Sequence, residues 1–483
     1  MTVTTSDDFS PRVHLSNLWG GRAGPIFGVP VPRQERDQNM AARPAIQTAR
    51  ADFLDSSLYE DASLGSLPRL TRSALLTPMT HAFDLAEGRR GGHAQRVAFI
   101  AAALAADLQL PAAAADDVFF AALLHDVGMA MVGPTAPETR SGARFLAGRL
   151  EELMSSRPRG GWGDVVEALT MHCELGGRIA KRLGFSDDVA MAVSSHHDCW
   201  DGSGPGGGGH AKSLLTTRIV AAADRFESMI DAEPSPLVVR RRGPRLVQEM
   251  SGSELDPEIA TRLADIAGRD EFWLGLYDAD LPTTLTEHDR GETLSSDELF
   301  AFVGVISEVV DERNSREAGR SRRVADRARQ LALSCGLAER RSDLVKVAAM
   351  LQDVGTLGIP ANILSKPDIL TIEEMMTVQK HPALARDILS EIPGFGAAAW
   401  WVSCHHERVD GKGYPGMLQG SEVPIEAQII GVCEAFEALT SNRPYRRALP
   451  IDDALDVLRG LSGTRFDAAL LETFEGLAVP IVA

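Results

Sequence analysis

The stretch Leu123-Leu124-His125-Asp126-Val127-Gly128 closes an apolar run and places an imidazole beside a carboxylate. A carboxylate has two oxygens, so Asp126 can bridge two metal ions while His125 holds one of them. A single His-Asp pair is more often a structural hydrogen bond than a catalytic site. The interpretation therefore depends on which other ligands the chain supplies.

Further candidate ligands occur in or beside helical patterns. Val97, Ile100 and Leu104 recur at three- and four-residue steps, which predicts a helix with His93 near one end. The ordered candidate ligands are His93, His125, Asp126, His172, His196, His197 and Asp224. Imidazole and carboxylate groups without thiolates suit iron, manganese, zinc or nickel. Each residue alone favours a structural role, but the ordered set predicts a metal centre.

The order of these residues resembles that of the HD-GYP family, a branch of the HD phosphohydrolase superfamily. The resemblance covers most of the chain after about residue 75, and it occurs twice. The second copy is closer to the family in its loop, which reads His405-His406-Glu407-Arg408-Val409-Asp410-Gly411-Lys412-Gly413-Tyr414-Pro415, followed by Leu439-Thr440-Ser441-Asn442-Arg443-Pro444-Tyr445-Arg446. The predicted fold is all-α, with two tandem HD-GYP-like helical domains.

The internal repeat also sets the expected domain organisation. We expect a largely disordered leader at 1–67, which is rich in Pro, Gly, Ser, Asp and Arg, and then a first copy at 68–277, a linker at 278–298 and a second copy at 299–483. The segment between Asp126 and His172 is longer than its counterpart between Asp353 and His381. This insertion is either a passive surface excursion or a lid beside the metal pocket.

The two copies differ in their ligands. When the halves are aligned, His93 corresponds to Arg320 and His125 corresponds to Gln352. A guanidinium has no lone pair to offer a metal, and an amide oxygen is a poor substitute for imidazole. The first copy keeps the complete ligand set. The second retains Asp353, His381, His405, His406 and Glu434, which we expect to hold one ion weakly at most.

The resemblance implies a two-metal phosphodiesterase in the first copy. Asp126 would be the bridging ligand, His125 its catalytic neighbour, and Fe, Mn or a similar divalent metal would bind at two ions per chain. The usual family substrate is cyclic di-GMP. Arg89 stands where some family members place another carboxylate, and Met129 and Thr356 stand where the family usually has a lysine that contacts phosphate.

The family's substrate-recognition motifs fall in the copy with the weaker ligand set. Lys412, Tyr414, Arg443 and Arg446 either serve a shared or regulatory pocket or only hold the second fold together. Two other functions therefore stay open beside the cyclic di-GMP phosphodiesterase. One is a catalytically inactive protein that binds a nucleotide or signalling partners, and the other is an HD phosphohydrolase for another nucleotide.

The composition limits the binding partners and the cellular compartment that we expect. A net charge of −18 argues against non-specific binding to nucleic acid or to an anionic membrane. The five cysteines lack the spacing of a zinc site or a disulfide framework, so we interpret them as small buried residues in a reducing cytoplasm. No signal pattern or long apolar segment is present. We expect a soluble protein whose two copies pack as an intramolecular pseudo-dimer, with a homodimer as a further option.

Overall fold

The structure of the protein is a computed structural model that describes residues 67–89, 91–131, 162–203, 214–232, 235–289, 293–314, 319–442 and 447–478. The leader apart from Leu67, most of the predicted insertion and the glycine-rich loop after Ser203 lie outside the described residues. Within them the chain forms helices and isolated bridges but no β-strand, which confirms the all-α prediction. No described helix combines the length and hydropathy needed to cross a bilayer.

The first copy contains most of the helices that precede residue 290. Its elements are α2 (Arg72–Ala86), α3 (His93–Asp107), α4 (Ala112–Leu124), the 3-10 helix η5 (Val127–Ala130), α6 (Trp162–Arg182), α7 (Asp187–Ser195), α8 (Leu215–Ala232), α9 (Pro236–Glu249), α10 (Pro257–Ala267), α11 (Asp270–Leu276) and α12 (Leu281–Thr286). Helix α12 lies within the predicted linker, where it packs against α2.

The second copy repeats this order. Its elements are α13 (Ser296–Arg313), α14 (Arg320–Ser334), α15 (Glu339–Leu351), η7 (Val354–Gly358), α16 (Ala361–Leu364), α17 (Ile372–Val378), α18 (His381–Ser390), α19 (Gly396–Cys404), η8 (Gly420–Glu422), α20 (Ile425–Thr440), α21 (Ile451–Arg459) and α22 (Ala468–Ala478). Helices α14, α15 and α20 therefore correspond to α3, α4 and α8.

A buried aspartate fixes the helix start that carries the first candidate ligand. Helix α3 begins after Gly92, whose φ of 96° is in the left-handed region that favours glycine. Asp84 accepts hydrogen bonds from the backbone N–H of Gly92 at 2.6 Å and of His93 at 2.9 Å. In the second copy Asp311 plays a similar part, because it accepts a bond at 2.9 Å from the backbone N–H of Ser321, the second residue of α14. These bonds satisfy helix-end donors and fix where His93 begins its helix.

The glycine after each His-Asp or Gln-Asp pair is required by packing. A Cβ atom on Gly128 would lie 1.9 Å from the carbonyl oxygen of His172, and one on Gly355 would lie 2.1 Å from that of His381. No side chain fits in this space, so a 3-10 helix can lie directly against the histidine-bearing helix only because the residue is glycine. The close approach brings Asp126 next to His172.

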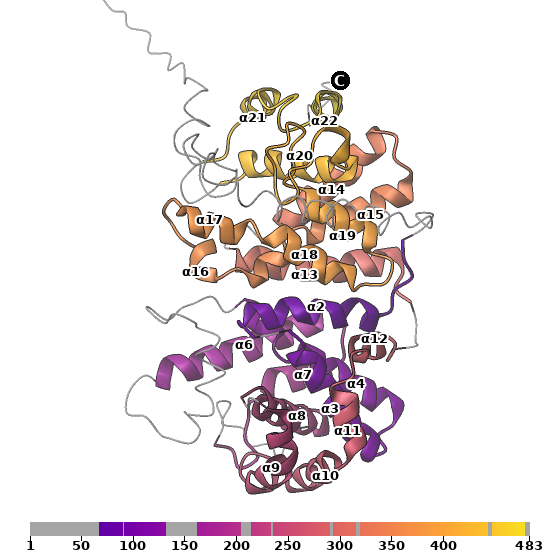
Figure 1. The fold of residues 1–483 in the computed structure, drawn as a ribbon, viewed down its shortest axis with the longest axis vertical. Helices are drawn as coiled ribbons and strands as arrows, with labels where there is room; N and C mark the ends of the chain where they lie inside the picture. Colours follow the sequence, from indigo (N-terminus) through magenta and orange to yellow (C-terminus); the bar gives the residue numbers. More distant parts are fainter. Residues whose placement is uncertain are drawn as a thin grey trace, which may run out of the picture.

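The two copies meet through equivalent elements. Helix α2 packs against η7 and α18 of the second copy, and α13 packs against η5 of the first. Figure 1 shows α2 and α13 on either side of the boundary between the lower and upper halves. Arg182 forms an ion pair with Glu308 across this boundary, and the Arg313 guanidinium donates to the carbonyl oxygen of Ala86 at 3.3 Å. Helices α2 and α13 thus each pack against the 3-10 helix that follows the His-Asp or Gln-Asp pair of the other copy.

Candidate metal centre

The seven candidate ligands of the first copy converge from separate elements. His93 opens α3, His125 and Asp126 follow α4, His172 lies in α6, His196 and His197 follow α7, and Asp224 lies in α8. All are buried except His197, which is partly exposed. Sequence reasoning selected these residues by order alone, and the fold brings every one of them into one cluster.

The carboxylate of Asp126 lies at the centre of the cluster. Its Oδ2 is 3.0 Å from Nε2 of His125 and 3.5 Å from Nε2 of His93. Its Oδ1 is 3.5 Å from Nε2 of His196 and 3.7 Å from Nε2 of His172. Each oxygen therefore faces a different pair of imidazoles, which is the arrangement that a carboxylate bridging two cations requires.

Two groups of ligand atoms result, which we call subsite A and subsite B. Subsite A consists of His93, His125 and Asp224, and subsite B consists of His172, Cys173, His196 and His197. Within each group the ligand atoms lie within 4.8 Å of one another. Asp224 links them, because its Oδ1 is 3.6 Å from Nε2 of His93 and its Oδ2 is 3.9 Å from Nδ1 of His197.

Hydrogen bonds to the far ring nitrogens orient the imidazoles. Nδ1 of His125 donates to the carbonyl oxygen of Ala122 at 2.7 Å, and Nδ1 of His196 donates to that of Val193 at 2.8 Å. In a neutral imidazole the proton on Nδ1 leaves a lone pair on Nε2. Nε2 is the atom that faces Asp126 in both residues, so the local helix geometry presents the metal-binding tautomer.

The electrostatics of the cluster favour cations. Burial opposes ionisation of Asp126, yet the surrounding imidazoles, that of His125 foremost, hold its pKa well below its usual range. Burial, reinforced by His196 and His172, lowers the pKa of His197 well below the usual value, so this ring is neutral and offers a lone pair. Burial and the charge of Asp126 raise the pKa of Glu87 well above its usual value.

The residues present fit a pair of divalent ions. Nε2 of His196 is buried and makes no hydrogen bond among the described residues, although it points at Asp126. A buried ring nitrogen without a hydrogen bond is unfavourable, and a cation held between this nitrogen and Asp126 would satisfy both groups. The donor set of imidazoles and carboxylates is the one that zinc, iron and manganese accept.

The second copy keeps one half of this arrangement and replaces the other. His381, His405 and His406 form a ligand group like subsite B, and Nε2 of His381 is 3.7 Å from Oδ1 of Asp353. Where subsite A would lie, the Arg320 guanidinium faces Glu434 at 3.3 Å and Asp353 at 3.7 Å. Both terminal atoms of the Gln352 amide are buried without a hydrogen bond among the described residues. A fixed organic cation therefore lies where the first copy has His93.

Comparison with known proteins agrees with this duplicated site. Two family models, each described as HD domain, match residues 90–229 and 304–470. The chain is a tandem HD-domain protein. The HD domains thus fall on the two copies of the metal-site geometry, and the match supports a metal-dependent phosphodiesterase.

Several relatives of this HD protein are cyclic-dinucleotide enzymes. The 3'3'-cGAMP-specific phosphodiesterase 3 of Vibrio cholerae is 26% identical over 82% of this chain and 92% of its own. A cyclic di-GMP phosphodiesterase of Thermotoga maritima is 33% identical over 37% of this chain and 49% of its own. The crystal structure of the V. cholerae cyclic GMP-AMP phosphodiesterase V-cGAP3 superposes with a TM-score of 0.60 at 25% identity, covering 86% of this chain and 99% of that one.

Side chains within residues 405–418, the second-copy loop that resembles the HD-GYP family, stabilise the conformation of that loop. The buried Glu407 carboxylate accepts hydrogen bonds from the backbone N–H of Gly416 at 2.5 Å and of Leu418 at 3.0 Å. Tyr414 is partly buried, with its ring 4.9 Å from that of His406. The Lys412 side chain is 71% exposed, and its Nζ lies 3.6 Å from Oδ2 of Asp410. Arg443 and Arg446 lie outside the described residues.

Sequence reasoning gave no role in the first copy's centre to four residues, which are Glu227, Arg96, Arg89 and Cys173. Glu227 contacts Nδ1 of His93 and Arg96, and Arg89 contacts Glu87 at 2.6 Å and Nδ1 of His93 at 3.3 Å. The fourth is Cys173, which was expected to be only a small buried residue. Burial opposes its thiolate, but His196 and His172 lower the pKa of Cys173 to about 6. A usable signal existed for Glu227 alone, because it lies one helical turn after Asp224.

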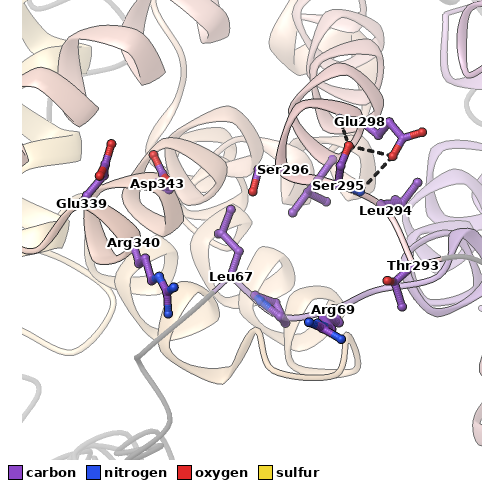
Figure 2. Close-up of a pocket in the computed structure, with 12 residues that line it drawn as sticks. Leu67, Arg69, Thr293, Leu294, Ser295, Ser296, Glu298, Glu339, Arg340 and Asp343 are labelled. Carbon is purple, nitrogen blue, oxygen red and sulfur yellow. Dashed lines mark hydrogen bonds between the residues drawn. The ribbon is translucent and has the colours of Figure 1, made fainter.

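A separate cavity of about 660 Å³ lies near the boundary of the two copies. Figure 2 shows Leu67 and Arg340 at its wall, with Ser295 hydrogen-bonded to Glu298 at the start of α13. No histidine lines it. The Ser295–Glu298 capping box satisfies the backbone N–H groups of both residues at this helix end, and none of the candidate metal ligands lines the cavity.

Proposed function

We propose that the first copy hydrolyses the 3'-5' phosphodiester of a cyclic dinucleotide. The observation that carries this proposal is the placement of Asp126, whose two oxygens face separate sets of imidazoles. When bound, two divalent ions supply Lewis acidity to the phosphodiester and lower the pKa of water. His93, His125 and Asp224 would hold one ion, and His172, His196 and His197 the other, with Asp126 between them.

The chain's own groups contribute orientation and charge. Ala122 and Val193 fix the tautomers of His125 and His196 through their carbonyl oxygens. Glu227 and Arg96 hold His93 from the side away from Asp126. The partly buried Arg89 guanidinium lies next to His93, where it adds positive charge that can offset a phosphate. Burial of the cluster excludes bulk water, which strengthens each of these interactions.

Two candidate substrates are supported by different observations. The resemblance of the motifs to the HD-GYP family favours cyclic di-GMP, in a cytoplasmic setting. The relatives that align across both copies favour a hybrid dinucleotide instead, because two of them are 3'3'-cGAMP-specific phosphodiesterases. The second copy is accessory in this proposal, since Arg320 displaces one subsite and leaves His381, His405, His406 and Asp353 for one weakly held ion.

The test compares Asp126→Asn with the matched variant Asp353→Asn in the full chain loaded with Mn²⁺ or Fe²⁺. Both nucleotides are supplied, and products are resolved by chromatography. We expect turnover to fall by at least about 100-fold in Asp126→Asn and to change little in Asp353→Asn. Loss in Asp353→Asn alone would place the chemistry in the second copy. If metal-loaded wild type hydrolysed neither nucleotide, the proposal would be wrong. The two remaining functions would then be a catalytically inactive binding protein and a phosphohydrolase for another nucleotide.

A further inference from the structure

The Cys173 thiol lies beside the candidate ligands of the first copy, but the proposed function gives it no role. Cys173 follows His172 on α6 and is buried. Its Sγ lies 3.6 Å from Nε2 of His172 and 3.9 Å from Nδ1 of His196. It is grouped with His172, His196 and His197, all of whose ligand atoms lie within 4.8 Å of one another. The thiol therefore belongs to the ligand group of subsite B through the metal-facing Nε2 of His172, whereas it approaches His196 at Nδ1, the nitrogen that also donates to Val193.

The separation of the sulfur and nitrogen atoms matches shared coordination. A tetrahedral ion with sulfur at about 2.3 Å and nitrogen at about 2.0 Å holds these two ligand atoms about 3.5 Å apart. Sγ of Cys173 and Nε2 of His172 are 3.6 Å apart. The same Nε2 also faces Oδ1 of Asp126, at 3.7 Å. Nε2 of His172 therefore faces both the sulfur and the bridging carboxylate, and an ion bound at this nitrogen is within reach of the sulfur.

Neither the equivalent position of the second copy nor the other buried cysteines place a thiol as Cys173 is placed. At the position equivalent to Cys173 the second copy has Pro382, directly after His381, so its histidine group has no sulfur. Cys199 is also buried near the first copy's histidines, but its Sγ accepts from Arg225 at 3.8 Å. Cys404 contacts Ser403 at 3.7 Å. Within the described residues, Cys173 is the one thiol grouped with candidate metal ligands.

We propose that Cys173 is a thiolate ligand of subsite B, which makes the two subsites chemically unequal. Subsite B then has nitrogen and sulfur donors and prefers a borderline ion such as Zn²⁺ or Fe²⁺. Subsite A, with two imidazoles and Asp224, accepts a harder ion such as Mn²⁺. The thiol loses its proton to solvent when the ion binds. This inference rests on the proposed metal centre but not on any particular nucleotide being its substrate.

Cobalt substitution tests the thiolate directly and without substrate. The full chain is loaded with Co²⁺, and the near-ultraviolet thiolate-to-cobalt charge-transfer absorption is recorded for wild type, Cys173→Ser and the control Cys199→Ser. We expect the band in wild type and in the control, and its loss in Cys173→Ser while visible cobalt absorption persists. We also expect the preference for Zn²⁺ over Mn²⁺ to fall about tenfold or more in Cys173→Ser. An unchanged charge-transfer band in Cys173→Ser would overturn the proposal.

A second measurement needs no variant and so does not depend on Cys173→Ser folding. X-ray absorption at the zinc edge of the Zn²⁺-loaded wild type should contain a sulfur shell at about 2.3 Å in addition to nitrogen and oxygen. Only light-atom scatterers around a bound zinc would overturn the proposal. Both measurements are made on resting protein, so failure of nucleotide hydrolysis and failure of sulfur ligation are observed separately.

Discussion

Buried carboxylates dominate the residues around Asp126. Asp84, Asp126, Asp224 and Glu227 are all buried, whereas the nearby fixed cations are Arg89 and Arg96. Burying an uncompensated charge is strongly unfavourable, so buried acids are paired or coordinate metals. Asp84 is used by the helix start and Glu227 by Arg96 and His93, which leaves Asp126 and Asp224 for cations that are not part of the chain.

Glu227 is expected to position a ligand rather than to bind metal. Glu227→Gln keeps the shape of the side chain but removes the charge that holds His93 and Arg96. We expect the affinity of subsite A for metal to fall about 10- to 100-fold, with the far-ultraviolet circular dichroism unchanged. Chelator competition measures this loss.

The matched control is Glu437→Gln, which removes the corresponding carboxylate from the second copy. Glu437 bonds Arg323 at 2.6 Å, just as Glu227 contacts Arg96, but Arg320 replaces the histidine there. We expect this control to leave metal binding by the first copy unchanged. Equal loss of affinity in both variants would show that the effect comes from general destabilisation.

Residue order was enough to predict which candidate ligands the fold brings together, but not the groups that surround them. His93, Asp126 and Asp224 belong to a spaced motif, so they could be found without coordinates. The proposed role of Cys173 depends on the side-chain orientation that places Sγ 3.6 Å from Nε2 of the neighbouring His172, and no spacing rule encodes that orientation. Arg89 was predicted only as a missing carboxylate, and its contact with His93 became visible in the fold.

At the scale of helices, one buried glutamate, Glu437, connects α14 and α20. Glu437 on α20 accepts from Arg323 at 2.6 Å and from Arg327 at 2.8 Å, both on α14. Burial opposes ionisation, but the hydrogen bonds from these two arginines lower the pKa of Glu437 below its ordinary value of 4.5. The folded chain therefore binds this proton more weakly than the unfolded chain does.

The sign of this shift gives a pH-dependent prediction. Stability from a carboxyl with a lowered pKa is complete above the unfolded pKa and is lost as pH falls through the folded value. At pH 7 we expect Glu437→Gln to lower the free energy of unfolding by about 1–2 kcal/mol. The difference from wild type should shrink steadily below about pH 4.5. Calorimetric unfolding of both proteins across this range measures it, and a difference independent of pH would contradict the assignment.

Helix types were predictable where apolar periodicity was strong, as along α3. The short helix α12 was not, because residues 278–298 are polar and carry Pro282, which fits the first turn of a helix as well as a linker. Its packing on α2 and the hydrogen bond from Ser73 to the carbonyl oxygen of Thr286 at 2.9 Å stabilise it. Tertiary contacts therefore determined an element that local sequence left ambiguous.

Across the whole molecule, the duplication preserves the architecture but not the chemistry. Helix α2 packs against η7 and α13 packs against η5, so the surface between the two copies includes the 3-10 helix next to each ligand cluster. Asp353 and Glu434 face a guanidinium where Asp126 and Asp224 face His93. An arginine neutralises these acids permanently. The second copy can thus stay folded without the second metal ion that the first copy's ligand set implies.

Restoring the two lost imidazoles should restore the missing subsite. In the full-length variant Arg320→His/Gln352→His, the acids Asp353 and Glu434 lose their fixed cation and gain two ligands in the positions that His93 and His125 occupy in the first copy. Because α14, α15 and η7 keep the arrangement of α3, α4 and η5, we expect one more tightly bound ion per chain than in wild type, measured by metal analysis after gel filtration. Arg320→Ala is the control, since it removes the cation without supplying imidazoles, and it should gain no tightly bound ion. A folded double variant that bound no more metal than wild type would contradict this prediction. The longer side chain of Glu434, which stands where the first copy has Asp224, would then be incompatible with the subsite, and replacing two ligands would not be enough to restore it.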